Sequence, residues 1–274
     1  MPAAADILPR GNSAKTASRR AFLGAPVPLF PALLFPVLLF GASMAITIAW
    51  CTAMVRMGAL PMPGGWSLSM AWLPICGQTW AGAAASFIGM WAVMMVAMML
   101  PSLTPALWRG RPASGALRPL LLMAMGYFLV WILPGAIVFP VGAGFAELLQ
   151  RHPALARAVP VLAGCVVAGA GLLQFTAWKA RHLARCRRMA DDRLPMGAGA
   201  ALRRGLRLGR HCTCSCAGFT AVLLAIGVMD LRAMALIMAA ITAERLAGDG
   251  IARSIGAVLL AAGLLLIARA AGLG

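Results

Sequence analysis

The chain has 274 residues, of which 62% are hydrophobic and only 11% are charged. Soluble domains carry about 25% charged residues, so this composition excludes a water-soluble globular enzyme and indicates a membrane protein. Taken alone, the formal net charge of +17 suggests a nucleic-acid partner, but ten of the 24 basic residues lie between Lys179 and Arg210, among apolar segments. Such clustering is typical of a cytoplasmic loop that obeys the positive-inside rule, and no nucleic-acid partner is expected.

The apolar segments predict the fold class. A helix needs about 20 apolar residues to cross about 30 Å of hydrocarbon. The predicted spans are residues 33–54, 80–100, 120–145, 159–178, 212–229, 231–246 and 251–268. The sequence therefore predicts an all-α, polytopic transmembrane helical bundle of about seven spans over residues 29–274, with the lipid bilayer as its surroundings. A disordered basic tail at 1–28 precedes the bundle, and a basic cytoplasmic loop lies at 179–211.

The fifth and sixth spans are divided near residues 227–232. Asp230 and Arg232 would each cost about 2.5–3.5 kcal/mol at a bilayer centre, and far less in a turn at the interface. The alternative is one tilted helix over residues 217–243, which gives six spans and makes Asp230 an intramembrane functional residue.

The distribution of Lys and Arg also predicts the orientation. With the N-terminus in the cytoplasm of a bacterial inner membrane, most basic residues lie on the cytoplasmic side. Residues 18–23 look like a twin-arginine export signal. A positive anchor for the first span is favoured instead, because the apolar run that follows is longer than a signal h-region.

A dense group of soft ligands opens the predicted fifth span. Its thiols and imidazole suit Cu(I) or Zn(II). The group consists of His211, Cys212, Cys214 and Cys216. Cys212 and Cys216 are four residues apart and share a helix face, whereas Cys214 points elsewhere. A helix N-terminus with neighbouring arginines would favour thiolates here. The alternative is that these cysteines are small side chains packed between helices.

A second pair, His182 and Cys186, follows the predicted fourth span with i,i+4 spacing. Both residues are expected on the same side of the membrane as the cysteine group. Together with Cys212 and Cys216 they make a four-ligand, zinc-type site geometrically possible.

Methionines form a stripe near the end of the second span. They are two i,i+4 pairs on adjoining faces: Met94, Met95, Met98 and Met99. Thioethers are neutral soft donors that suit Cu(I), although Met is also a common filler of helix interfaces. The second span runs from outside to inside, so these methionines are expected near the cytoplasmic face, as are the cysteines.

Three polar residues are expected at the same face: Gln174, Lys179 and Glu244. They are candidates for groups that contact the metal ligands. Glu244 and Arg245 are favoured as an interfacial ion pair. On the outer side, the sulfur residues have no spacing that supports a site; these are Cys51, Met62, Met70 and Cys76.

The sequence lacks the usual signs of catalysis. It contains no Walker loop, nucleophile elbow, HExxH motif or dinucleotide fingerprint, and it has three histidines and seven acidic residues. Little general acid–base equipment is therefore available, and the protein is not expected to be an enzyme.

Four segments together carry a resemblance to a known family. They are residues 91–102, the Gln174…Lys179…Cys186-Arg187 run, the Gly205…Gly209…Cys212 approach, and residues 227–230 with Glu244-Arg245. Over residues 66–268 the chain resembles bacterial membrane proteins that are catalogued as predicted metal-binding integral membrane proteins, of unknown function. The resemblance implies a helical membrane fold and metal binding. The family usually has a cysteine where His182 stands, and adjacent cysteines followed by an aromatic where this chain reads Cys214-Ser215-Cys216-Ala217.

The favoured hypothesis is a membrane protein that handles or delivers a soft transition metal, with Cu(I) preferred to Zn(II). The thiolates near Cys212 would be the primary ligands, and the methionine stripe a transfer site. A metal-donor protein or a metalloprotein would be the partner. Two alternatives stay open: a membrane thiol-disulfide oxidoreductase, and a non-catalytic assembly factor whose cysteines only pack.

Overall fold

The structure is a computed structural model that describes residues 29–74, 77–109, 117–191 and 197–272. The chain divides into two compact units, Met1–Phe35 and Pro36–Gly274, and every site below lies in the second unit. The predicted tail at 1–28 lies outside the described residues.

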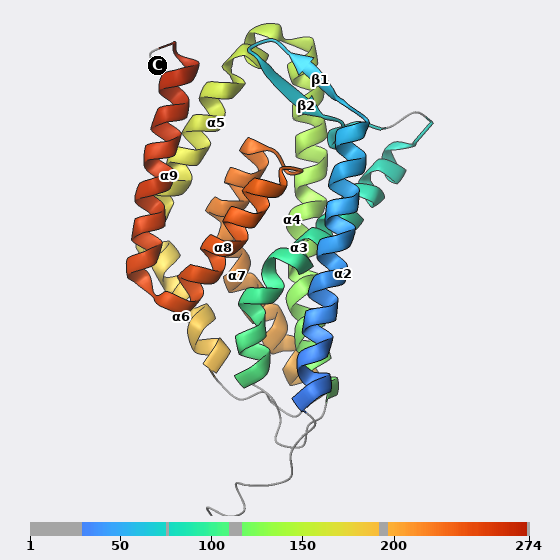
Figure 1. The fold of residues 1–274 in the computed structure, drawn as a ribbon, viewed down its shortest axis with the longest axis vertical. Coiled ribbons are helices and arrows are strands. Elements are labelled where there is room, and N and C mark those ends of the chain that lie inside the picture. The colour runs from blue at the N-terminus through green and yellow to red at the C-terminus, as the bar shows by residue number, and fades with distance from the viewer. Residues whose placement is uncertain (1–28, 75–76, 110–116, 192–196, 273–274) are drawn as a thin grey trace, which may run out of the picture. The chain divides into compact units, whose positions relative to one another are not determined.

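The described part of the chain is built from helices and one small hairpin (Figure 1). The helices are α2 (Leu29–Arg56), α3 (Trp80–Arg109), α4 (Leu117–Arg151), α5 (Pro153–Leu173), α6 (Ala177–Asp191), α7 (Ala198–Ile226), α8 (Leu231–Ala247) and α9 (Asp249–Ala270). Between α2 and α3 lie β1 (Ala59–Met62), β2 (Trp66–Ser69) and the short 3-10 helix η2 (Met70–Trp72). The predicted helical fold class is therefore confirmed, whereas the hairpin was not predicted.

Five helices are long and apolar enough to cross a membrane. They contain the segments Pro36–Arg56, Trp80–Trp108, Leu117–Arg151, Pro153–Leu173 and Gly250–Ala270. The count of seven spans is not confirmed. Helix α8 has 17 residues, about 26 Å at 1.5 Å per residue, which is shorter than the hydrocarbon core. The first half of α7 carries four arginines.

The predicted break near residues 227–232 is confirmed, although α7 and α8 are not among the five helices above. Helix α7 ends at Ile226, and its C-cap is Gly227, whose φ of 142° lies in a region that side chains rarely adopt. Asp230 then caps α8, because its Oδ1 accepts hydrogen bonds from the backbone N–H groups of Arg232 at 2.8 Å and Ala233 at 3.0 Å. The alternative of a single helix over 217–243 is wrong, because the C-cap Gly227 and the N-cap Asp230 interrupt it.

The segment predicted as a loop at 179–211 is largely helical. Helix α6 runs to Asp191, and α7 already begins at Ala198. The arginines of α7 lower the hydropathy of its first half, so this part was predicted as a loop. Its buried residues nevertheless recur at helical spacing: Ala201, Gly205, Leu208 and Cys212. Cys212 therefore lies well inside α7 rather than at a helix N-terminus, and the predicted activation by that terminus is wrong.

Helices α4 and α7 approach through glycines. A Cβ on Gly205 would lie 2.1 Å from the carbonyl oxygen of Met123, and one on Gly209 would lie 2.8 Å from that of Tyr127. Only glycine permits this backbone-to-backbone contact, as at the small-residue interfaces of membrane helices. The contact brings α4 beside the turn of α7 that carries Cys212. Helices α5 and α9 also lie side by side, with glycines between them (Figure 1).

Candidate metal centre

Three sulfur atoms meet inside the helical unit, where α3 packs near α7. The Sγ of Cys212 lies 3.9 Å from the Sγ of Cys216 and 4.0 Å from the Sδ of Met99. All three side chains are buried, with at most 2% of each residue exposed. We call this group, Cys212, Cys216 and Met99, the Cys212 centre. It confirms that Cys212 and Cys216 share one helix face.

The spacing of these sulfurs matches that of ligands around one ion. With metal–thiolate bonds of about 2.3 Å, two sulfurs stand about 4.0 Å apart in a trigonal site and about 3.8 Å apart in a tetrahedral one. The two separations at Cys212 fall in this range. Thiolate and thioether ligands are both soft, so the donor set suits Cu(I).

Two polar groups from other helices contact the Cys212 sulfur. The phenol oxygen of Tyr127 in α4 lies 2.9 Å from it. The guanidinium of Arg245 in α8 donates a hydrogen bond to it through Nη2. A cationic donor favours the thiolate over the thiol, and the thiolate is the form that binds a metal. Arg245 also donates to the carbonyl oxygen of Ser102 at 3.4 Å.

A buried ion pair supports α7 next to the centre. The Nζ of Lys179 lies 2.8 Å from Oε2 of Glu244, and both side chains are at most 3% exposed. The same Nζ donates to the carbonyl oxygen of Ser215 at 2.6 Å. The ion pair predicted between Glu244 and Arg245 is therefore wrong: adjacent helical side chains diverge, so Glu244 faces Lys179 while Arg245 faces Cys212. Gln174, the third predicted polar residue, is also buried.

The two predicted histidines pair with each other. Nδ1 of His182 lies 3.1 Å from Nδ1 of His211. Partial burial, with nearby arginines, lowers the pKa of both imidazoles, which favours their neutral form. Among the residues that the structure describes, no group of three or more His, Cys, Asp or Glu is placed to hold a metal ion. The four donors His182, Cys186, Cys212 and Cys216 thus do not gather into a zinc-type site here.

The remaining predicted sulfur residues differ in environment. Cys186 is buried, and its burial raises the pKa of the thiol to about 11. Cys214 is only partly buried, consistent with its position on another face of α7. Met94, Met95 and Met98 are buried in the same core cluster as Cys212. The methionine stripe therefore faces protein rather than lipid.

A pocket shares one residue, Arg245, with the surroundings of the centre. It has a volume of about 240 Å³ and is lined in part by Cys186, Arg187 and Arg245. Arg245 also donates to Cys212, whereas the three sulfur residues of the centre do not line the pocket. Its outer residues include Leu246, which is exposed.

Sequence reasoning missed Tyr127 and assigned Arg245 to the wrong partner. Tyr127 is the single tyrosine of the chain, and it lies in the middle of an apolar segment. A buried phenol needs a hydrogen-bond partner, so its isolation was a usable signal. The identity of that partner depends on helix packing, which sequence spacing does not reveal.

A comparison with protein families assigns the chain to a family. Residues 88–266, more than half of the chain, match the family model PpoB2, described as copper chaperone. The chain belongs to this copper chaperone family. Membership indicates copper handling and a non-catalytic role. Neither the curated proteins nor the solved structures give a match to the chain.

Proposed function

We propose that this member of the copper chaperone family is a membrane-embedded carrier that holds Cu(I) at the Cys212 centre and passes it to another protein. Cu(I) is its cargo, and Zn(II) is the second candidate. The proposed location is the bacterial inner membrane, with the N-terminus in the cytoplasm. The five apolar helices support membrane insertion.

One observation carries the proposal: the buried group of three soft donors at the Cys212 centre, one of which accepts a hydrogen bond from an arginine. Two thiols of α7 and a thioether of α3 lie at separations that one ion could bridge. Ordinary core packing accounts for a buried cysteine, but it does not account for an arginine that donates to the same sulfur. Binding Cu(I) would neutralise the thiolate charge and release thiol protons.

The surroundings suggest how the ion moves. Met94, Met95 and Met98 continue from Met99 along α3 and offer neutral donors that exchange a Cu(I) ion without a change of charge. The pocket lined by Cys186 and Arg245 is the proposed docking point for a partner protein, because Arg245 also contacts Cys212. Cys186 lines this pocket, and we propose it as the first ligand during transfer to a metal-donor or metalloprotein partner.

The remaining predicted donors have weaker support. His182 and His211 contact each other, and Cys214 lies on another face of α7, so we propose these three only as accessory donors near the centre. Gln174, Lys179 and Glu244 act on the centre through the position of α7 rather than by touching the ion. Family membership favours copper handling over a thiol-disulfide oxidoreductase.

The test measures bound copper. The purified full chain is titrated with Cu(I) under anaerobic conditions against a chromophoric chelator, and the titration is repeated with Cys212→Ser/Cys216→Ser. We expect the double variant to lose the tightest site, because a serine hydroxyl is a poor ligand for a soft ion.

Cys165→Ser is the matched control, since Cys165 is exposed. It should bind Cu(I) like the wild type. An unchanged affinity and stoichiometry in the double variant would remove the thiols from the proposal.

A further inference from the structure

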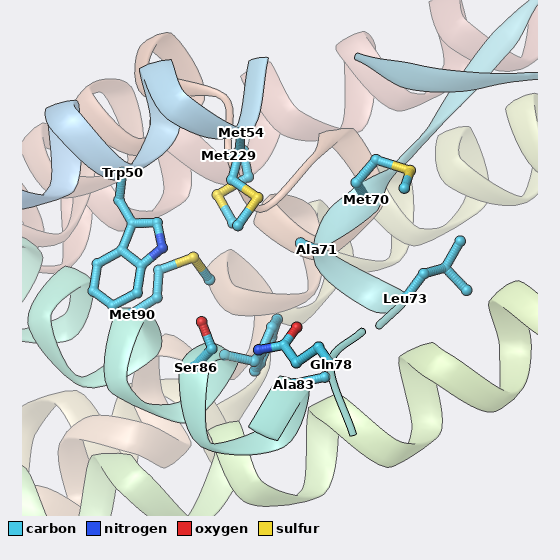
Figure 2. A pocket seen from close by; sticks show the side chains of 11 residues that line it. Trp50, Met54, Met70, Ala71, Leu73, Gln78, Ala83, Ser86, Met90 and Met229 are labelled. Atoms are coloured by element: carbon cyan, nitrogen blue, oxygen red, sulfur yellow. The ribbon is translucent and has the colours of Figure 1, made fainter. Parts of the chain in front are cut away.

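A second group of sulfurs lies away from the Cys212 centre. Four methionines line one small cavity: Met54, Met70, Met90 and Met229. Figure 2 shows that they come from four elements, namely α2, η2, α3 and the turn between α7 and α8. We call this group the thioether pocket. It includes Met70, one of the outer-side sulfur residues whose spacing in the sequence supported no site.

These methionines do not simply fill space. Methionine is flexible and normally closes gaps in a core, yet here the side chains leave a cavity of about 20 Å³ between them. A cavity of 10–15 Å³ is about the least that holds one water molecule. The pocket therefore has room for a single small guest, such as a bare metal ion.

A thiol adds a further donor. The Sγ of Cys51 lies 3.8 Å from the Sδ of Met229, and Cys51 is buried. This separation equals that of two sulfurs around one tetrahedral ion with bonds of about 2.3 Å. In the Cys212 centre the same spacing recurs between sulfurs from different helices.

The pocket is connected to the Cys212 centre by α3. Met90 lies in the pocket, and Met94 and Met98 follow at i+4 and i+8, on one face of the helix. Met99, which contacts Cys212, is nine residues beyond Met90, or about 14 Å along the helix axis. Each of these α3 methionines is buried. Met99 lies about half a turn round α3 from Met90, so the buried thioethers follow α3 both along and around its axis between the two sulfur groups.

We propose that the thioether pocket is a second Cu(I) site, with Met54, Met90 and Met229 as ligands and Cys51 as a further donor. Thioethers are neutral and soft, so the pocket selects Cu(I) over divalent ions such as Zn(II). As an entry site it would receive Cu(I) and release it along the α3 methionines to the Cys212 centre. This transfer step rests on the proposed function, whereas the second site does not.

The test uses the full chain in detergent with three changes, Met54→Leu/Met90→Leu/Met229→Leu. Leucine has a similar volume and usually preserves the fold. Anaerobic Cu(I) titration should give two equivalents for the wild type and one for this triple variant. Cys212→Ser/Cys216→Ser should also bind one equivalent, and the combined variant none. The control Met57→Leu/Met125→Leu changes two exposed methionines and should bind two.

A second measurement does not depend on stoichiometry. In Cys212→Ser/Cys216→Ser labelled at the methionine methyl carbons, one equivalent of Ag(I), a stable mimic of Cu(I), should shift the signals of Met54, Met90 and Met229. The signals of Met57 and Met125 should stay in place. Two equivalents in the triple variant, or unmoved signals of the three pocket methyls, would overturn the second site. Loss of the Cys212 site leaves this readout intact, so the two proposals fail separately.

Discussion

The Cys212 centre and the thioether pocket both gather sulfur from several helices, but their surroundings differ. Around Cys212 lie a phenol, a guanidinium and, next to the same turn of α7, a buried ion pair. The thioether pocket is lined mainly by apolar groups, with Gln78 and Ser86 as its polar side chains. Thiolates carry charge and require such partners in a buried site, whereas thioethers do not. Under the proposed function, the first site would retain Cu(I) and the second would exchange it.

The largest effect is expected from the ion pair beside the centre. Lys179→Met would leave the Glu244 carboxylate buried without its cation, and removing one partner of a buried pair typically costs about 3–5 kcal/mol. We expect a marked fall in the thermal unfolding temperature. The double variant Lys179→Met/Glu244→Leu should recover much of it, because no uncompensated charge remains. Equal destabilisation by both variants would show that the pair does not support α7 electrostatically.

A smaller, site-specific effect is expected from Arg245→Gln. A hydrogen bond to a charged group is worth about 1.5–3 kcal/mol, so the Cu(I) affinity of the Cys212 centre should fall about ten- to hundredfold. The thioether pocket should be unaffected, since Arg245 does not line it. Arg253→Gln changes an exposed arginine and is the control. A parallel loss of affinity at both sites would contradict the distinction drawn between them.

Lowering the pH should weaken Cu(I) binding at the Cys212 centre more than at the thioether pocket. Below the usual thiol pKa of about 8.5, each thiol that loses its proton on binding lowers the apparent affinity by about tenfold per unit fall in pH. Thioethers carry no proton, so once Cys51 is also changed to serine the affinity of the pocket should stay constant from pH 8 to pH 5. The variant Met54→Leu/Met90→Leu/Met229→Leu retains only the Cys212 centre, and Cys212→Ser/Cys216→Ser, here with Cys51→Ser, retains only the thioether pocket. Titrating each with Cu(I) against a chelator between pH 8 and pH 5 measures how the affinity of each site depends on pH. A flat profile for the Cys212 centre would argue against thiol ligands.

Local sequence signals predicted much of the fold. Apolar length located α2, α3, α4, α5 and α9, and the Gly227–Asp230 segment marked the break before α8, because each signal is contained within one stretch of chain. The extent of α7 was missed since its arginines resembled a loop. Strands β1 and β2 have four residues each, too few for a reliable alternating pattern.

The candidate site was only partly predictable for the same reason. The i,i+4 spacing of Cys212 and Cys216 is local, and their shared face was confirmed. Partners from other helices, such as Tyr127, depend on how those helices pack, which spacing does not encode. The thioether pocket was missed because its members come from four separate segments with no common period.

The glycines at the α4–α7 contact fix the position of the Cys212 thiol relative to α4. Since the backbone of α7 touches that of α4 at Gly205 and Gly209, no flexible side chain is available there to absorb a shift. This contact keeps the Cys212 sulfur beside Tyr127. A side chain at either glycine would push the two helices apart and displace Cys212, so under the proposed function it would impair Cu(I) binding although every sulfur atom is retained.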